Sequence, residues 1–322
     1  RLFTPADSRV PNEIEPNRLY YGRIVNPASH RQVDEVLLSF MRAPRTYTRQ
    51  DVVEINAHGG PIPLREILTL CLREGARAAH EGEFTLRAFL NGRLDLAQAE
   101  AVLDVICAKT EAALRVAVDQ LGGRLSREVR AIRSALVETL AYLEATIDFA
   151  DNEIPSRDIG PELATTERRL DDLLRSANRG VIYRQGIHTA IVGRPNVGKS
   201  SLLNVLLRAD RAIVTPIPGT TRDTLEETIN LQGVPLVLVD TAGINESDDL
   251  VERLGVERSR RSVERADLVL WVVEGSEPLT EADAQVAALL DHKPTIVVIN
   301  KSDLPAAPNI EADLARLLPP AP

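Results

Sequence analysis

The sequence predicts a doubly wound α/β domain with a mostly parallel sheet, together with an α-helical bundle domain and a small N-terminal α+β domain. Three observations support this division: short β-like runs in residues 1–86, apolar residues at helical spacing in residues 87–187, and apolar strands alternating with amphipathic helices in residues 188–322. Strands that alternate with helices form parallel sheets, which carry ligands at the carboxyl ends of their strands.

The first two regions differ in their periodicity. Glu35–Phe40 and Asp51–Ile55 are β-like, and a helix is expected near Leu64–Glu74. Further on, Gly122-Gly123 and the segment Asp151–Gly160 separate helices whose apolar residues recur every three or four positions. These stripes are typical of a helical core, so they predict a bundle and no site. They comprise Val129, Ile132, Leu136, Leu140, Leu143 and Ile147, and then Leu163, Leu170, Leu174, Ala177 and Val181.

Composition limits the class of protein. The 322 residues are 44% hydrophobic and 26% charged, which is typical of a globular chain, and no apolar run approaches the roughly 20 residues of a membrane span. A net charge of −9 argues against a broad nucleic-acid-binding face. The two cysteines, Cys71 and Cys107, are expected to be small buried side chains in a cytoplasmic protein.

The strands of the third region end in motifs that carry chemistry. The expected strands are Thr189–Val192, Val234–Val239, Leu268–Val273 and Thr295–Ile299. Gly193–Ser200 follows the first of them and fits the phosphate-loop pattern G-x-x-x-x-G-K-[ST], with the amphipathic helix Ser201–Leu207 behind it. Lys199 would neutralise the β and γ phosphates and Ser200 would ligate Mg²⁺.

The base is indicated by Asn300, Lys301 and Asp303 after the last strand, because a carboxylate there can accept from guanine N1–H and the 2-amino group. Asp240–Gly243 follows the second strand, where Asp240 would hold Mg²⁺ through water, and Thr221 would complete the Mg²⁺ shell. The predicted class is a P-loop GTPase. The residues expected to bind GTP are Asn196, Val197, Gly198, Lys199, Ser200, Ser201, Thr215, Pro216, Ile217, Pro218, Gly219, Thr220, Thr221, Asp240, Thr241, Ala242, Gly243, Asn300, Lys301 and Asp303.

Ile244 stands where many GTPases carry a glutamine that orients the attacking water. An aliphatic side chain cannot orient water. The water-orienting group and the charge of an arginine finger must therefore come from elsewhere.

These motifs resemble the TrmE/Era/EngA class of GTPases, with Asn196 in the phosphate loop and an aliphatic residue after Gly243. Upstream, Glu83–Glu100 resembles the MnmE (TrmE) family, and Asp51–Glu54, His58–Gly60 and Asp148–Ile154 match it too. The resemblance implies that the GTPase domain is inserted in the helical domain and that the N-terminal domain binds 5-formyl-tetrahydrofolate and forms a homodimer. It implies modification of carbon 5 of the tRNA wobble uridine together with the flavoprotein MnmG.

The resemblance also implies site residues. Glu252 matches the family's catalytic glutamate, beside Lys199 as the second catalytic residue. K⁺ would be held by Asn196 and by the backbone carbonyls of Thr215, Ile217 and Thr220. Glu54 and Arg93 match folate-binding positions, although the family more often has lysine at Arg93.

Two departures from the family pattern are expected to matter. The opening residues and the family's C-terminal part, including the end of the GTPase domain and further bundle helices, have no match here. The bundle helices are therefore expected to expose apolar stripes. The alternative function is a ribosome-assembly GTPase that acts as an RNA-binding switch of the Era/EngA type, which a basic domain after the GTPase domain would support. An inactive scaffold that only dimerises is a third alternative, which the intact motifs oppose.

Overall fold

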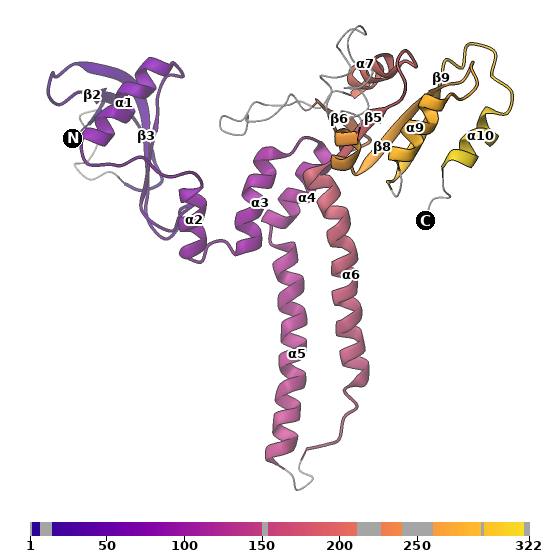
Figure 1. Ribbon diagram of the computed structural model, residues 1–322. Helices are drawn as coiled ribbons and strands as arrows, with labels where there is room; N and C mark the ends of the chain where they lie inside the picture. The colour runs from indigo at the N-terminus through magenta and orange to yellow at the C-terminus, as the bar shows by residue number, and fades with distance from the viewer. Residues whose placement is uncertain are drawn as a thin grey trace. The chain divides into compact units, whose positions relative to one another are not determined.

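The computed structural model describes residues 2–6, 15–149, 154–210, 227–239, 260–290 and 293–318, except for the side chains of residues 178, 179, 209 and 210 (Figure 1). Two compact units divide the chain. The first comprises Arg1–Leu103 with Gln120–Ser126, and the second comprises Asp104–Asp119 with Arg127–Pro322.

The N-terminal unit is built on an antiparallel sheet in the order β1-β2-β3-β4. Its strands are β1 Phe3–Pro5, β2 Leu19–Val25, β3 Gln32–Met41 and β4 Val52–Asn56. Burial alternates along β2, since successive side chains point to opposite faces. One face packs on helix α1, Pro61–Arg73, through Ile24, Val36, Ile67 and Leu70. This is the predicted α+β arrangement.

A buried carboxylate holds the segment that precedes helix α2, Glu83–Leu90. Glu83 is 8% exposed and accepts from Arg77 Nη2 and Arg87 Nη2, each at 2.6 Å, and from the backbone N–H of His80 at 2.9 Å. The hydrogen bonds from Arg77, followed by those from His80 and Arg87, hold the pKa of Glu83 well below its usual range. The start of α2 is therefore tied to both its preceding loop and its own next turn.

Four helices follow α2 along the chain before β5: α3 Leu96–Cys107, α4 Glu111–Leu121, α5 Arg124–Asp148 and α6 Gly160–Gln185. Gly122-Gly123 separates α4 from α5 as predicted, and Gly123 has a left-handed φ of 77°. The apolar stripes of α5 and α6 are largely exposed, with Leu140 at 54% and Leu174 at 67%. That exposure agrees with the expectation of uncovered stripes.

The second sheet has the order β6-β7-β5-β8-β9. Its strands are β5 Ile187–Val192, β6 Glu227–Leu231, β7 Val234–Leu238, β8 Leu268–Glu274 and β9 Thr295–Asn300. All pairs are parallel except β6·β7, a hairpin that adds an antiparallel edge strand. The four predicted strands are confirmed, whereas the sequence analysis did not identify β6.

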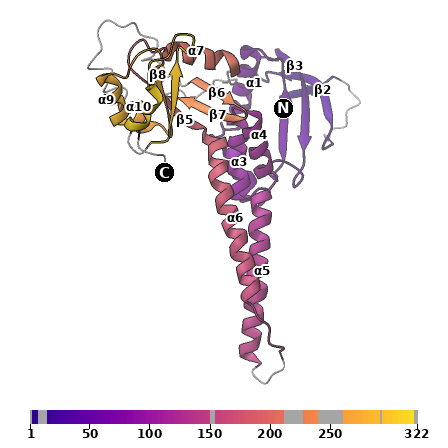
Figure 2. The same ribbon diagram turned by 90° about the vertical axis from the view of Figure 1, so that its right-hand side faces the viewer.

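Both faces of this sheet are covered, as a doubly wound fold requires. Helices α9 (Glu281–Leu289) and α10 (Ile310–Leu317) pack on one face with Trp271 and Val269, and Figures 1 and 2 show the two helices together on that side. Helix α7, Lys199–Asp210, packs on the other face through Leu203.

The loop before α4 is joined to the β6–β7 hairpin within the second unit. Thr110 Oγ1 donates to the Gly233 carbonyl at 2.7 Å, and Lys109 Nζ donates to Thr228 Oγ1 at 3.2 Å. Gly233 has a φ of 95°, and a Cβ there would crowd Ala112. Residues of the helical region and of the second sheet thus share one compact unit.

The apolar character of the helices and the burial of the two cysteines can also be compared with the expectations from composition. No helix in the described ranges is long and apolar enough to cross a membrane. The expectation that both cysteines are buried is wrong for Cys107, which is exposed at the end of α3, and Cys71 is half-buried. An apolar stripe at helical spacing does not by itself show which turns another element covers.

Candidate nucleotide-binding site

The phosphate loop lies between β5 and α7, at the carboxyl edge of the sheet (Figure 1). Gly193 and Gly198 have φ of 151° and 98°. A Cβ on Gly193 would collide with the Val272 carbonyl, and one on Gly198 would collide with the Asn300 side chain. Both glycines are therefore required by close packing against β8 and β9, in addition to the approach of phosphate oxygens.

The lysine of the loop is folded back onto its own backbone. Lys199 Nζ donates to the carbonyls of Gly193 at 2.9 Å and Arg194 at 2.7 Å. Ser200 is exposed in the first turn of α7, where the helix N-terminus carries partial positive charge. The ammonium, the hydroxyl and the helix N-terminus therefore come together at one edge, which is what a Mg²⁺-bound polyphosphate needs.

Asn196 is exposed in the loop with a left-handed φ of 64°. Asparagine tolerates this conformation better than most side chains, and such outliers gather at functional sites. The role of Asn196 as a K⁺ ligand stays a prediction.

Asn300, the last residue of β9, is bound directly to the phosphate loop. Asn300 Nδ2 donates to the Val197 carbonyl at 2.7 Å, and the Asn300 carbonyl accepts from the Gly275 N–H at 2.8 Å. Since β8 lies between β5 and β9, Asn300 spans a whole strand to reach the loop. Asp303 is exposed two residues beyond Lys301, and Lys301 has a φ of 58°.

Arg194 is directed toward acidic groups of the β8–α9 region. Its Nη2 lies 2.6 Å from Glu277 and 3.7 Å from Glu274, and its Nε lies 3.8 Å from Asp283. The hydrogen bond to Glu277 raises the pKa of Arg194, and the side chain is only 17% exposed. A guanidinium held in this way is not free to serve as an internal arginine finger.

The sequence did not predict this cluster of Glu274, Glu277 and Asp283. Arg194 occupies a variable position of the motif, and Glu274 ends the strand between the two strands that carry the nucleotide motifs. Glu274 Oε2 accepts from Lys301 Nζ at 2.8 Å. That hydrogen bond, followed by the one from Ser276, lowers the pKa of Glu274. A charged residue at the carboxyl end of β8 was the available signal.

Several predicted residues lie outside the described part of the chain. They are Thr215, Pro216, Ile217, Pro218, Gly219, Thr220, Thr221, Asp240, Thr241, Ala242, Gly243, Ile244 and Glu252. The described half of the site therefore comprises the phosphate loop and the segment after β9.

The two residues expected to bind folate lie in the N-terminal unit. Glu54 is exposed on β4 opposite Ser39, while the Arg93 guanidinium lies 4.8 Å from the ring centroid of Tyr47. Tyr47 is in turn hydrogen-bonded to Thr85 at 3.0 Å. No hydrogen bond or ion pair joins Glu54 to Arg93 within the described residues of this unit.

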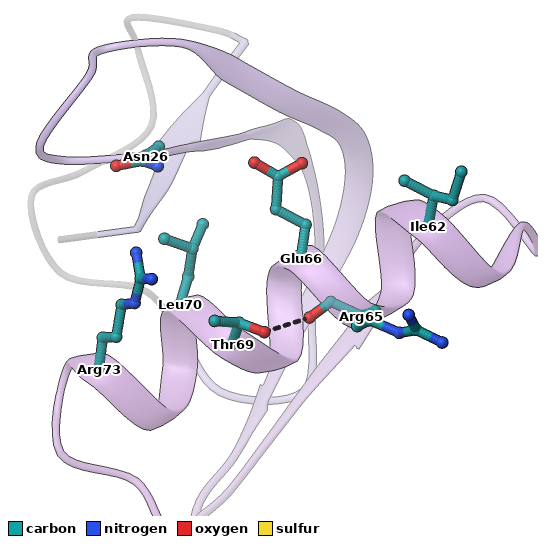
Figure 3. A pocket seen from close by; sticks show the side chains of 7 residues that line it. All are labelled: Asn26, Ile62, Arg65, Glu66, Thr69, Leu70 and Arg73. Carbon is teal, nitrogen blue, oxygen red and sulfur yellow. Dashed lines mark hydrogen bonds between the residues drawn. The ribbon is translucent and has the colours of Figure 1, made fainter.

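The same unit contains a hollow that is lined by other residues than Glu54 and Arg93 (Figure 3). Six of its seven lining residues come from α1, and Asn26 faces them from the turn after β2. It includes neither Glu54 nor Arg93. The hollow and the expected folate residues are therefore separate features.

A phosphate loop after β5 and an Asn-Lys-x-Asp segment after β9, joined by Asn300 on a doubly wound sheet, define a P-loop GTPase domain. Residues 188–301 match the family model of the 50S ribosome-binding GTPases, and residues 1–93 match that of the GTP-binding protein TrmE N-terminus.

Curated relatives extend the similarity over nearly the whole chain. The tRNA modification GTPase MnmE of Roseiflexus castenholzii is 55% identical over 94% of this chain and 65% of its own length. The MnmE proteins of Geobacillus thermodenitrificans and Bacillus subtilis are each 50% identical, over 97% and 99% of this chain and 68% and 70% of their own. The chain belongs to the MnmE family of tRNA modification GTPases. It spans about two thirds of the length of these relatives.

Asn300→Ala tests the bond between the two motifs. The change removes the donor to Val197 and leaves that carbonyl unpaired, which should cost about 1–3 kcal/mol. We expect guanine nucleotide affinity to fall by about tenfold in a fluorescence titration. Asn56→Ala, which removes an amide-to-carbonyl bond in the N-terminal sheet, is the control and should bind nucleotide normally. Unchanged affinity in Asn300→Ala would show that this bond does not shape the site.

Proposed function

We propose that this chain binds Mg²⁺ and GTP and hydrolyses GTP in the service of tRNA modification. The observation that carries the proposal is the contact between the phosphate loop and the Asn300–Asp303 segment, because it holds phosphate and base recognition in one site. Ser200 would ligate Mg²⁺, with Thr221 as the second ligand. Mg²⁺, when bound, neutralises charge on the β and γ phosphates.

We infer the reaction that GTP hydrolysis serves from the membership in this family. Acting as a homodimer with the flavoprotein MnmG, the protein would place an aminomethyl or carboxymethylaminomethyl group on carbon 5 of the tRNA wobble uridine in the cytoplasm. The GTPase domain would be inserted in a helical bundle whose further helices cover the stripes of α5 and α6. A net charge of −9 supports tRNA contact made largely through the complex.

A ribosome-assembly switch of the Era/EngA type is the second candidate. The match of residues 188–301 to the 50S ribosome-binding GTPases favours it, but that match covers the GTPase domain alone. The match of residues 1–93 to the TrmE N-terminus favours tRNA modification.

Asp303→Asn should switch base preference from guanine toward xanthine. Exchanging the carboxylate for an amide removes an acceptor for the guanine donors and offers a donor that suits the 2-oxo group of xanthine. GTP affinity should fall by roughly 1.5–3 kcal/mol, the value of a charge-assisted hydrogen bond, and calorimetry with GTP and XTP measures both effects. Asp313→Asn on α10 is the matched control. GTP binding that is unaltered in Asp303→Asn would reject the base assignment.

The charge for catalysis is proposed to come from K⁺ and the water-positioning group from Glu252. Arg194, the only arginine of the phosphate loop, is held by Glu277, Glu274 and Asp283, which supports a cation other than arginine. Asn196, exposed with its left-handed backbone, would ligate K⁺ together with the carbonyls of Thr215, Ile217 and Thr220. The ordering of that loop would depend on two GTPase domains meeting across it.

GTP turnover should therefore be faster in KCl than in NaCl, and Asn196→Ala should remove the difference. Glu252→Ala should lower turnover by about two orders of magnitude, the range of a lost acid–base or positioning group, with little change in nucleotide affinity. Steady-state hydrolysis and nucleotide titration in matched salts provide both readings, with exposed Glu281→Ala as the control. Equal rates in the two salts would reject the role of K⁺. Normal hydrolysis by Glu252→Ala would reject the catalytic role of Glu252.

The N-terminal unit is proposed to bind 5-formyl-tetrahydrofolate through Glu54 and Arg93. A carboxylate suits the donors of a pterin, and a guanidinium suits the glutamyl carboxylate. Tyr47 supports the second assignment, since its ring holds the Arg93 guanidinium at the surface.

Calorimetry with 5-formyl-tetrahydrofolate tests this site. Glu54→Ala and Arg93→Ala together should lower affinity by at least about tenfold, since each removes a charge-assisted contact. Arg65→Ala, in the hollow of Figure 3, is the control and should bind like the unaltered chain. Folate binding that survives the double change, or is lost in the control, would place the ligand elsewhere.

A further inference from the structure

The Glu274 carboxylate lies between two cations that come from different nucleotide motifs. Its Oε2 is 2.8 Å from Lys301 Nζ and 3.7 Å from Arg194 Nη2, and its Oε1 accepts from Ser276 Oγ at 2.9 Å. Glu274 ends β8, the strand between β5 and β9. Its side chain therefore occupies the place where the phosphate loop and the Asn300–Asp303 segment meet.

The two cations depend on Glu274 unequally. Arg194 also has Glu277 at 2.6 Å and Asp283 at 3.8 Å. For Lys301, Glu274 is the sole carboxylate partner within the described ranges. Since the Glu274 side chain is 11% exposed, solvent screens the Lys301 pair less than a surface ion pair. Loss of the Glu274 charge should release Lys301 while Arg194 stays held.

The backbone beside Glu274 is bound to the same segment. The Gly275 N–H donates to the Asn300 carbonyl, and the Gly275 carbonyl accepts from the Ala307 N–H, both at 2.8 Å. A Cβ on Gly275 would crowd Ile299 and the Asn300 carbonyl. The end of β8 thus fixes the segment after β9 through its backbone as well as through its side chain.

We propose that Glu274 is a positioning residue that couples the phosphate loop to the guanine-recognition segment. Its carboxylate bridges the Lys301 ammonium of one motif and the Arg194 guanidinium of the other. Glu274 acts through Lys301 and touches no part of the nucleotide itself. Binding of the base and binding of the phosphates then support each other, because each orders the segment that the other uses. The inference rests on the proposed function, since it requires a guanine nucleotide in this site.

A purely structural ion pair would give a different result. It would lower the melting temperature but would leave nucleotide affinity nearly unchanged once the protein is folded. Positioning through Lys301 predicts instead that changes at Glu274 and Lys301 act on the same step. The fold-loss of nucleotide affinity in the double variant should then be smaller than the product of the two single losses.

The experiment uses the full chain and a fluorescent N-methylanthraniloyl GDP, with affinity from titration and dissociation rate from stopped flow. Glu274→Gln and Lys301→Met should each weaken binding by about tenfold, mainly through faster dissociation. The double variant should be no weaker than Lys301→Met alone. Glu274→Asp, which keeps the charge on a shorter stem, should recover part of the affinity. Glu277→Gln, which removes a contact of Arg194 only, should stay within about twofold of the unaltered chain.

The outcomes distinguish failure of the proposed function from failure of the positioning role of Glu274. An unaltered chain that fails to bind the probe refutes the proposed function. Binding by the unaltered chain together with unchanged affinity in Glu274→Gln, or effects of Glu274→Gln and Lys301→Met that multiply, overturns the positioning role alone. If circular dichroism shows that Glu274→Gln is unfolded, Glu274→Asp replaces it in the cycle with Lys301→Met and the same two readings apply.

Discussion

One hydrogen bond across the sheet, from the Asn300 amide to the Val197 carbonyl, joins the phosphate loop directly to the base segment. The strand order places β8 between the phosphate loop and the base segment, so a contact between the two motifs must reach across that strand. Gly198 is shaped to that contact, since a side chain there would occupy the space of the Asn300 amide. Phosphate and base recognition are thus packed as one unit.

Two basic residues of the phosphate loop, Lys199 and Arg194, have different surroundings. Lys199 remains on the loop's own carbonyls, close to where phosphates would lie. Arg194 is directed to Glu274, Glu277 and Asp283 and braces the loop against the start of α9. The two cations of the motif therefore have different partners, which are backbone carbonyls of the loop for Lys199 and carboxylates for Arg194. A monovalent cation as the source of extra charge is consistent with this division.

Periodicity and motif spacing predicted the parallel strands and the phosphate loop because both follow from local patterns along the chain. The antiparallel edge strand β6 was not identified, since Glu227–Leu231 is short and is defined by its pairing with β7. Glu274 was missed for a related reason: its significance comes from neighbours that are 27 and 80 positions away in the sequence, Lys301 and Arg194. Cys107 shows the reverse error, in which an apolar pattern suggested burial on a turn that is exposed.

The carboxylate of Glu83 has a consequence for the N-terminal unit in acid. Because Arg77, His80 and Arg87 depress its pKa from the ordinary value of 4.5, Glu83 contributes its full stabilisation above that pH. The contribution is lost only as the pH falls from the ordinary value toward the depressed one, since the unfolded chain takes up its proton first. In that range the folded chain keeps Glu83 ionised and its hydrogen bonds at the start of α2 formed, while their contribution to the free energy of unfolding falls with the pH.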